Sequence, residues 1–168
     1  MAGEAGASSL KPRVVFDCMV FLQGAGCSAG PARACLSLVD DDRVILFMSD
    51  QILVEVRDVL TRPKSQRKFP MLTLESVNEF SRDVARKSVV LANVPNAYSN
   101  LRDPKDEPYL NVAIAANADY LVSRDLDLLD LMKDADFRQQ YPSLTILNPV
   151  AFLQVMAHRE LTEHQETS

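Results

Sequence analysis

Histidine, cysteine and long apolar runs are scarce in this chain of 168 residues, and each scarcity excludes a class of site. The two histidines, His158 and His164, lie in the polar C-terminal stretch, so no histidine is placed to serve as a catalytic base. The three cysteines, Cys18, Cys27 and Cys35, are odd in number and lack C-x-x-C spacing. We therefore expect neither a disulfide framework nor a zinc site.

No stretch approaches the ~20 apolar residues that a membrane-spanning helix needs, so we expect no membrane association. The first dozen residues lack an apolar run, and we expect no signal peptide. Together with the cysteine pattern, which fits a reducing compartment, this predicts a cytoplasmic protein. The net charge of −5 argues mildly against a broad grip on nucleic acid, which usually needs a basic face.

Short apolar runs alternate with helical patterns along the chain. The predicted strands are 13–16, 44–47, 89–91, 120–123 and 145–147. The predicted helices are 31–39, 50–60, one capped by Thr73, 106–116, 126–132 and one beginning at Asn148-Pro149. This alternation predicts an α/β fold, a three-layer sandwich in which helices flank a mostly parallel sheet of about five strands. We expect one domain over 13–156, with flexible tails at 1–12 and 157–168.

Four acidic residues fall near the ends of successive strands, where an open parallel sheet binds its ligands. Asp17 directly follows the first strand, and Glu55 lies in the second turn of the helix after the second strand. Asp106 begins the helix after the third strand, and Asp125 lies two residues beyond the fourth. We expect the four carboxylates to share one edge of the sheet.

Each acid also has a structural explanation. Asp106 could be a helix N-cap, and Asp125 could form a turn that leads into the next helix. Asp17 follows a buried run, and Glu55 borders the apolar stripe of its helix, so a purely structural role explains these two less well. The sequence therefore ranks Asp17 and Glu55 above Asp106 and Asp125 as functional residues.

Clustered carboxylates repel one another, and a divalent cation with a preference for oxygen ligands removes that repulsion. No Gly-rich phosphate loop of the Walker type accompanies them. An acid-only site without histidine suits metal-assisted hydrolysis of a phosphodiester.

Four runs of sequence together resemble the PIN domain family, and most closely the PIN-type toxins of prokaryotic toxin–antitoxin pairs. They are Val14-Val15-Phe16-Asp17, the segment 49–60 around Glu55, Asp103-Pro104-Lys105-Asp106, and YLVSRDLDLL at 120–129. Each run alone is weakly diagnostic, whereas their order and spacing are specific. The resemblance extends over about 13–156.

The resemblance implies a Mg²⁺- or Mn²⁺-dependent endoribonuclease directed at single-stranded RNA. It assigns the catalytic and metal-binding roles to Asp17, Glu55, Asp106 and Asp125, with Asp127 as a further outer ligand and Ser123 in support. It also implies an RNA substrate, a small antitoxin as partner and a homodimer. Arg57, Arg62, Lys64 and Arg124 are candidates for RNA contact, although a solvated basic loop or local ion pairs would explain them equally.

Met19 departs from the family pattern, which often has asparagine two residues after the first acid. Met19 cannot donate the hydrogen bonds that orient neighbouring acids, which leaves open a PIN-fold RNA- or protein-binding module with little or no nuclease activity. Met19 also argues against a phosphatase that needs a second aspartate at this position.

Overall fold

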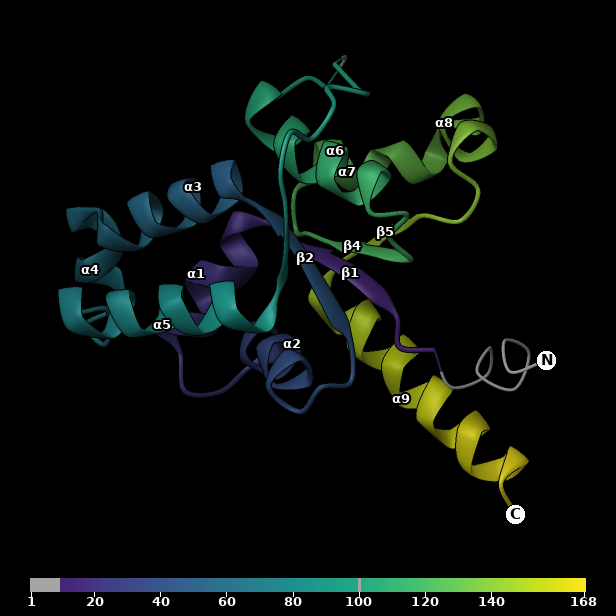
Figure 1. Ribbon diagram of the computed structural model, residues 1–168, viewed down its shortest axis with the longest axis horizontal. Helices are drawn as coiled ribbons and strands as arrows, with labels where there is room; N and C mark the ends of the chain where they lie inside the picture. The colour runs from purple at the N-terminus through teal and green to yellow at the C-terminus, as the bar shows by residue number, and fades with distance from the viewer. Residues whose placement is uncertain (1–9, 100) are drawn as a thin grey trace.

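The computed structural model describes residues 10–99 and 101–168, so most of the predicted tail at 1–12 lies outside the described residues. A parallel sheet with strand order β3-β2-β1-β4-β5 forms the centre of the fold (Figure 1). Its strands are β1 (Arg13–Phe16), β2 (Ile45–Ser49), β3 (Val89–Leu91), β4 (Tyr120–Val122) and β5 (Thr145–Leu147). All five predicted strands are therefore present, and all pair in parallel.

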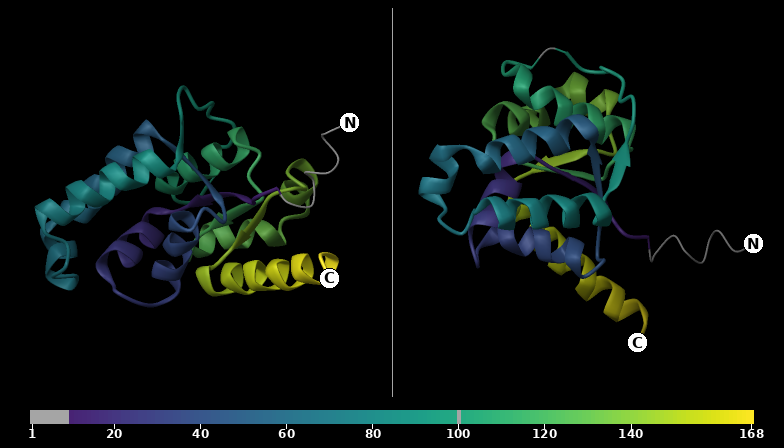
Figure 2. Two further views of the ribbon diagram at one scale, coloured as in Figure 1. Left: turned by 60° about the horizontal axis from the view of Figure 1, so that its bottom comes forward. Right: turned by 60° about the vertical axis from the view of Figure 1, so that its left-hand side comes forward.

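Helices cover both faces of the sheet, as predicted for a sandwich. They are α1 (Cys18–Gly26), α2 (Pro31–Asp40), α3 (Asp50–Thr61), α4 (Pro63–Lys68), α5 (Leu74–Lys87), α6 (Glu107–Ala115), α7 (Leu126–Leu129), α8 (Ala135–Gln140) and α9 (Pro149–Glu166). Two 3₁₀ turns, η2 (Pro104–Asp106) and η3 (Asp130–Lys133), precede α6 and follow α7. Helix α6 packs on β1, β2 and β4, whereas α9 lies on the opposite face against β4 and α2 (Figure 2, left).

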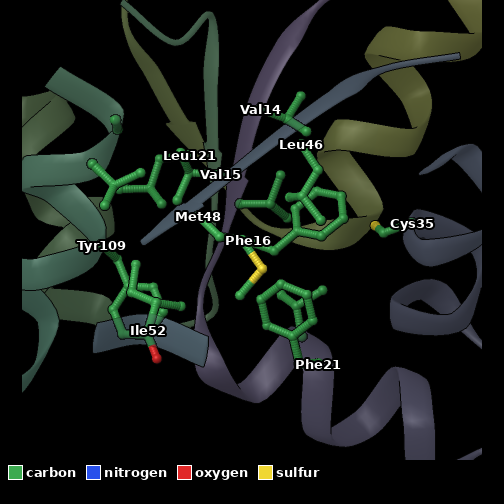
Figure 3. Packing of buried hydrophobic residues seen from close by; sticks show 14 of the residues in the cluster. Val14, Val15, Phe16, Phe21, Cys35, Leu46, Met48, Ile52, Tyr109 and Leu121 are labelled. Carbon is green, nitrogen blue, oxygen red and sulfur yellow. The ribbon is translucent and has the colours of Figure 1, made fainter. Parts of the chain in front are cut away.

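The central strand β1 is buried because its apolar run faces helices on both sides of the sheet. Val14, Val15 and Phe16 are each at most 1% exposed and belong to one core that also holds Phe21 and Tyr109 (Figure 3). Because β1 is central, the residue that follows it emerges in the middle of the sheet edge.

Helix α1 is not among the predicted elements, and its glycines explain why. A Cβ at Gly24 would lie 2.4 Å from Cδ1 of Leu36, and one at Gly26 would lie 2.5 Å from Cγ of Phe69. Glycine weakens a helix by local propensity, but here it permits close packing against neighbouring elements. The helix also lacks a polar face that would give it an amphipathic pattern.

Two further departures concern helix ends. Pro63 lies shortly after the predicted helix 50–60 and begins a further helix, α4, since proline is well suited to the first turn. Helix α9 continues to Glu166, so the predicted tail at 157–168 is mostly helical, and Arg43 contacts Glu160 at 2.7 Å. The flexibility of this segment stays a prediction. Within the described ranges, no helix has the length and apolar character that crossing a membrane requires.

Candidate active site

Asp17 and Ser123 meet at the point where strand order reverses, beyond the carboxyl ends of β1 and β4. The backbone N–H of Asp17 donates to the Val122 carbonyl at 3.1 Å, and the Ser123 hydroxyl donates to Oδ2 of Asp17. The other carboxylate oxygen of Asp17 caps α1 by accepting from the N–H of Val20 at 3.1 Å. Asp17 is 5% exposed, and burial is the main cause that raises its pKa above the ordinary value. The first acid is therefore held on both of its oxygens.

Asp125 is tied to the same network. Its backbone N–H donates to the Ser123 hydroxyl oxygen at 2.9 Å. Its Oδ1 atom accepts from the N–H of Asp127 at 2.8 Å and from that of Leu128 at 3.3 Å, which caps α7. The structural role foreseen for Asp125 is thus real, and it orients the carboxylate beside Asp17.

Asp106 has no comparable structural role. It occupies the N-cap position of α6 but makes no capping hydrogen bond, and Asp103 caps η2 instead by accepting from the N–H of Lys105 at 3.0 Å. Its Oδ2 atom is buried and finds no hydrogen-bond partner within the described residues. Burial, followed by the negative charges of Asp125 and Asp103, raises the pKa of Asp106 to about 7.

Glu55 approaches the site from α3, which Ser49 caps by accepting from the N–H of Ile52 at 3.2 Å. The side chain is half-buried, and no hydrogen bond or ion pair engages its carboxylate in the described part of the chain. Tyr109 lies near it, because the charge of Glu55 is among the causes, after burial and Cys18, that raise the pKa of the Tyr109 hydroxyl.

The four predicted acids line one cavity of about 410 Å³. The residues that surround it are Asp17, Cys18, Met19, Glu55, Val59, Arg62, Asp103, Lys105, Asp106, Tyr109, Arg124 and Asp125. Arg62 and Arg124, two of the predicted RNA contacts, are thus at the cavity.

Three predicted residues lie elsewhere. Arg57 contacts Asn78 and lines a separate groove between α3 and α5, and Lys64 lies on α4 outside the cavity lining. Asp127 also lies outside the lining, with its Oδ1 atom 3.8 Å from Nε of Arg102. The structure therefore does not bring these three side chains into the cavity lining, although the backbone N–H of Asp127 contacts Asp125.

Sequence reasoning missed several residues of the cavity. Lys105 and Asp103 belong to the DPKD run but were given no role, although they flank Asp106 closely. Tyr109 follows Asp106 by three residues, a spacing that puts two side chains on the same face of a helix. That spacing was the available signal for Tyr109.

The donor atoms of this cavity suit a hard divalent cation, since carboxylate oxygens dominate the set. The orphaned, buried Oδ2 of Asp106 supports the fit, because a buried polar atom without a partner costs free energy that a ligand recovers. As the side chains stand, no three acidic, histidine or cysteine residues of the described chain converge into a metal-binding group.

Comparison with known proteins places this geometry in a family. Residues 13–127, well over half of the chain, match the profile described as PIN domain. No curated protein matches the chain. The matched segment contains the central strand, all four acids and Ser123, and ends in α7. The chain belongs to the PIN domain family, whose members are generally nucleases that use divalent metal ions.

Proposed function

We propose that this protein is a Mg²⁺- or Mn²⁺-dependent endoribonuclease that hydrolyses RNA phosphodiesters at the acidic cavity. One observation carries the proposal: Asp106 has a buried carboxylate oxygen without a partner, close to the charges of Asp125 and Asp17. An acid kept only for structure would cap a helix or pair with a cation, and Asp106 does neither among the described residues.

The four acids divide into two pairs with different supports. Ser123 and the backbone hold Asp17 and Asp125, so these two give fixed oxygen donors at the sheet edge. Oδ2 of Asp106 has no hydrogen-bond partner within the described residues, and the Glu55 carboxylate forms no ion pair there, so both are available as further metal-binding oxygens from η2 and α3. Bound Mg²⁺ or Mn²⁺ would supply Lewis acidity for hydrolysis of the phosphodiester.

Cations at the rim of the cavity supply contacts for RNA phosphates. Arg124 and Lys105 are exposed and form no ion pair within residues 10–99 and 101–168, whereas Arg62 contacts Asp58 at 2.7 Å. Arg124 and Lys105 are therefore free to meet a phosphate at the same cavity as the acids. Because such contacts release counterions, we expect RNA binding to weaken as salt rises.

The proposal is tested by incubating the purified protein with RNA in Mn²⁺, and again in EDTA. Asp17→Asn preserves the size and the capping oxygen of Asp17, so the protein should still fold cooperatively. Because it replaces a proposed metal-binding carboxylate with a neutral amide, we expect it to abolish cleavage. Asp41→Asn is the matched control, since Asp41 is exposed at the end of α2 and its carboxylate forms no hydrogen bond in the described chain. Cleavage that survives EDTA, or that folded Asp17→Asn retains in full, would refute the proposal.

The toxin role, the small antitoxin and the homodimer rest on the resemblance and form a second, finer part of the proposal. Inhibition of cleavage by the product of a neighbouring small gene would support this part. RNA binding without cleavage at any Mn²⁺ concentration would favour the alternative, a PIN-fold binding module. That alternative is motivated by Met19, which is 41% exposed at the cavity and provides no hydrogen-bond donor.

A further inference from the structure

Tyr109 presents a second buried polar atom without a partner, separate from that of Asp106. Its side chain is 2% exposed and belongs to the same buried cluster as Ile52 of α3 (Figure 3). The hydroxyl oxygen is buried and has no hydrogen-bond partner within the described residues. Buried tyrosine hydroxyls usually find a partner, and leaving one unsatisfied costs on the order of 1–3 kcal/mol. A phenylalanine would fill the same space without that cost, so the hydroxyl calls for an explanation.

Cys18 and Glu55 both lie near this hydroxyl, and of the two the Glu55 carboxylate is the stronger acceptor, since a thiol sulfur accepts only weakly. Glu55 follows Ile52 by three residues on α3, so it lies one turn along on the same side of the helix. Both Glu55 and Tyr109 line the acidic cavity, and both lack hydrogen bonds in the described chain. Because Glu55 is only half-buried, its side chain has room to change rotamer and accept from the hydroxyl.

We propose that Tyr109 is a positioning residue, whose hydroxyl donates to one carboxylate oxygen of Glu55 and directs the other oxygen toward the metal. This inference rests on the proposed function, since it concerns the same metal site. A tyrosine hydroxyl is protonated near neutral pH and donates a short, charge-assisted hydrogen bond to a carboxylate. Within the described residues Glu55 forms no ion pair, and Arg62, the cation nearest to it in the cavity lining, contacts Asp58 at 2.7 Å instead.

The proposal also bears on Met19. Met19 provides no hydrogen-bond donor for the neighbouring acids, and Asp17 accepts a hydrogen bond from the Ser123 hydroxyl instead. Glu55 would depend instead on a donor from α6. Support of this kind for a metal ligand usually contributes about 10- to 100-fold to metal affinity or activity.

The test measures Mn²⁺ affinity by calorimetry on the full chain, with Tyr109→Phe as the variant. We expect a Kd about 10-fold or more above that of the unaltered protein, with a melting temperature in EDTA that is not lowered. Tyr120→Phe is the matched control, because Tyr120 is half-buried and packs on Phe152 at 5.6 Å, away from the cavity lining. This control should bind Mn²⁺ as the unaltered protein does.

A double-mutant cycle distinguishes action through Glu55 from a general packing effect. In the Glu55→Gln background, Tyr109→Phe should weaken Mn²⁺ binding by less than threefold further. Full additivity of the two changes, or an unchanged Kd for folded Tyr109→Phe, would overturn this inference while leaving the proposed function intact. If the unaltered protein binds no Mn²⁺, the inference and the proposed function both fail.

Discussion

Replacing Asp106 with asparagine should stabilise the metal-free protein above pH 7, although it removes a proposed metal ligand. The folded structure holds this carboxylate near Asp125 and Asp103, with one oxygen buried and unbonded. The unfolded chain separates these charges and hydrates the carboxylate. Ionised Asp106 therefore favours the unfolded state, and a neutral amide of nearly the same size does not.

The magnitude follows from the pKa of Asp106, which rises from 3.8 to about 7 on folding. This difference corresponds to at most about 4 kcal/mol of unfolding free energy. Asp106 is partly exposed, and solvent screens its interactions, so we expect about 1–2 kcal/mol. For a domain of this size, that gain corresponds to an increase in melting temperature of about 2–8 °C.

The pH dependence has a definite sign. Because folding raises the pKa of Asp106, its stabilising contribution is fully present below pH 4 and is lost as the pH rises through about 7. The advantage of Asp106→Asn over the unaltered protein should therefore be small at pH 4, grow between pH 4 and pH 7, and stay constant above.

Thermal melts in EDTA from pH 4 to pH 8 measure this difference, and Asp41→Asn serves as the control that should show no such trend. Adding Mn²⁺ should reverse the order at pH 8, because metal stabilises only the form that binds it. A destabilised Asp106→Asn protein at pH 8 in EDTA would refute the argument that Asp106 is an uncompensated charge.

Three further changes test the supports of the site. Ser123→Ala removes the donor to Asp17 and the acceptor for the N–H of Asp125, so it should lower the unfolding free energy by about 1–3 kcal/mol. Urea titrations measure this loss, and an unchanged midpoint would contradict the bridging role of Ser123. Asn111→Ala removes the acceptor that binds the N–H of Tyr98 at 2.8 Å, so hydrogen exchange at the Tyr98 amide should accelerate relative to the amides of β1. If the Tyr98 amide is equally protected in the variant and the unaltered protein, Asn111 does not hold this loop. Lys105→Ala should weaken RNA binding and reduce the slope of log affinity against log salt by about 0.7, and an unchanged slope would remove Lys105 from the phosphate contacts.

The gathering of the acids could be predicted from sequence because it depends on strand order alone. Asp17 and Asp125 follow apolar strands directly, and parallel strands end at a common edge. The structural roles of the individual acids could not be predicted in the same way. Asp17, ranked among the first, caps α1 and accepts from Ser123, whereas Asp106, ranked lower as a presumed cap, caps nothing. Local sequence shows that a residue can cap a helix, but only the backbone geometry shows whether it does.

The remaining differences come from contacts distant in the sequence. Helix α1 packs against Leu36 and Phe69, and the local sequence around Gly24 and Gly26 does not predict these contacts. Arg57 was grouped with the RNA contacts because it is near Glu55 in sequence. Residues two positions apart on a helix, such as Glu55 and Arg57, lie on nearly opposite faces, and Arg57 accordingly faces α5.

The two pairs of acids differ in what can adjust them. The sheet sets Asp17 and Asp125 through Ser123, so a change there disturbs the fold as well as the site. Glu55 and Asp106 lie on α3 and η2, outside the sheet. Residues of α6 lie close to both: Tyr109 is near Glu55, and Asn111 binds the loop that leads to Asp106. Under the proposed function, variation in α6 would therefore alter metal affinity while the sheet stays intact. If the proposed metal site and the proposed bond from Tyr109 are correct, the second pair of acids would take its support from α6, and Met19 beside the first acid would not prevent metal binding.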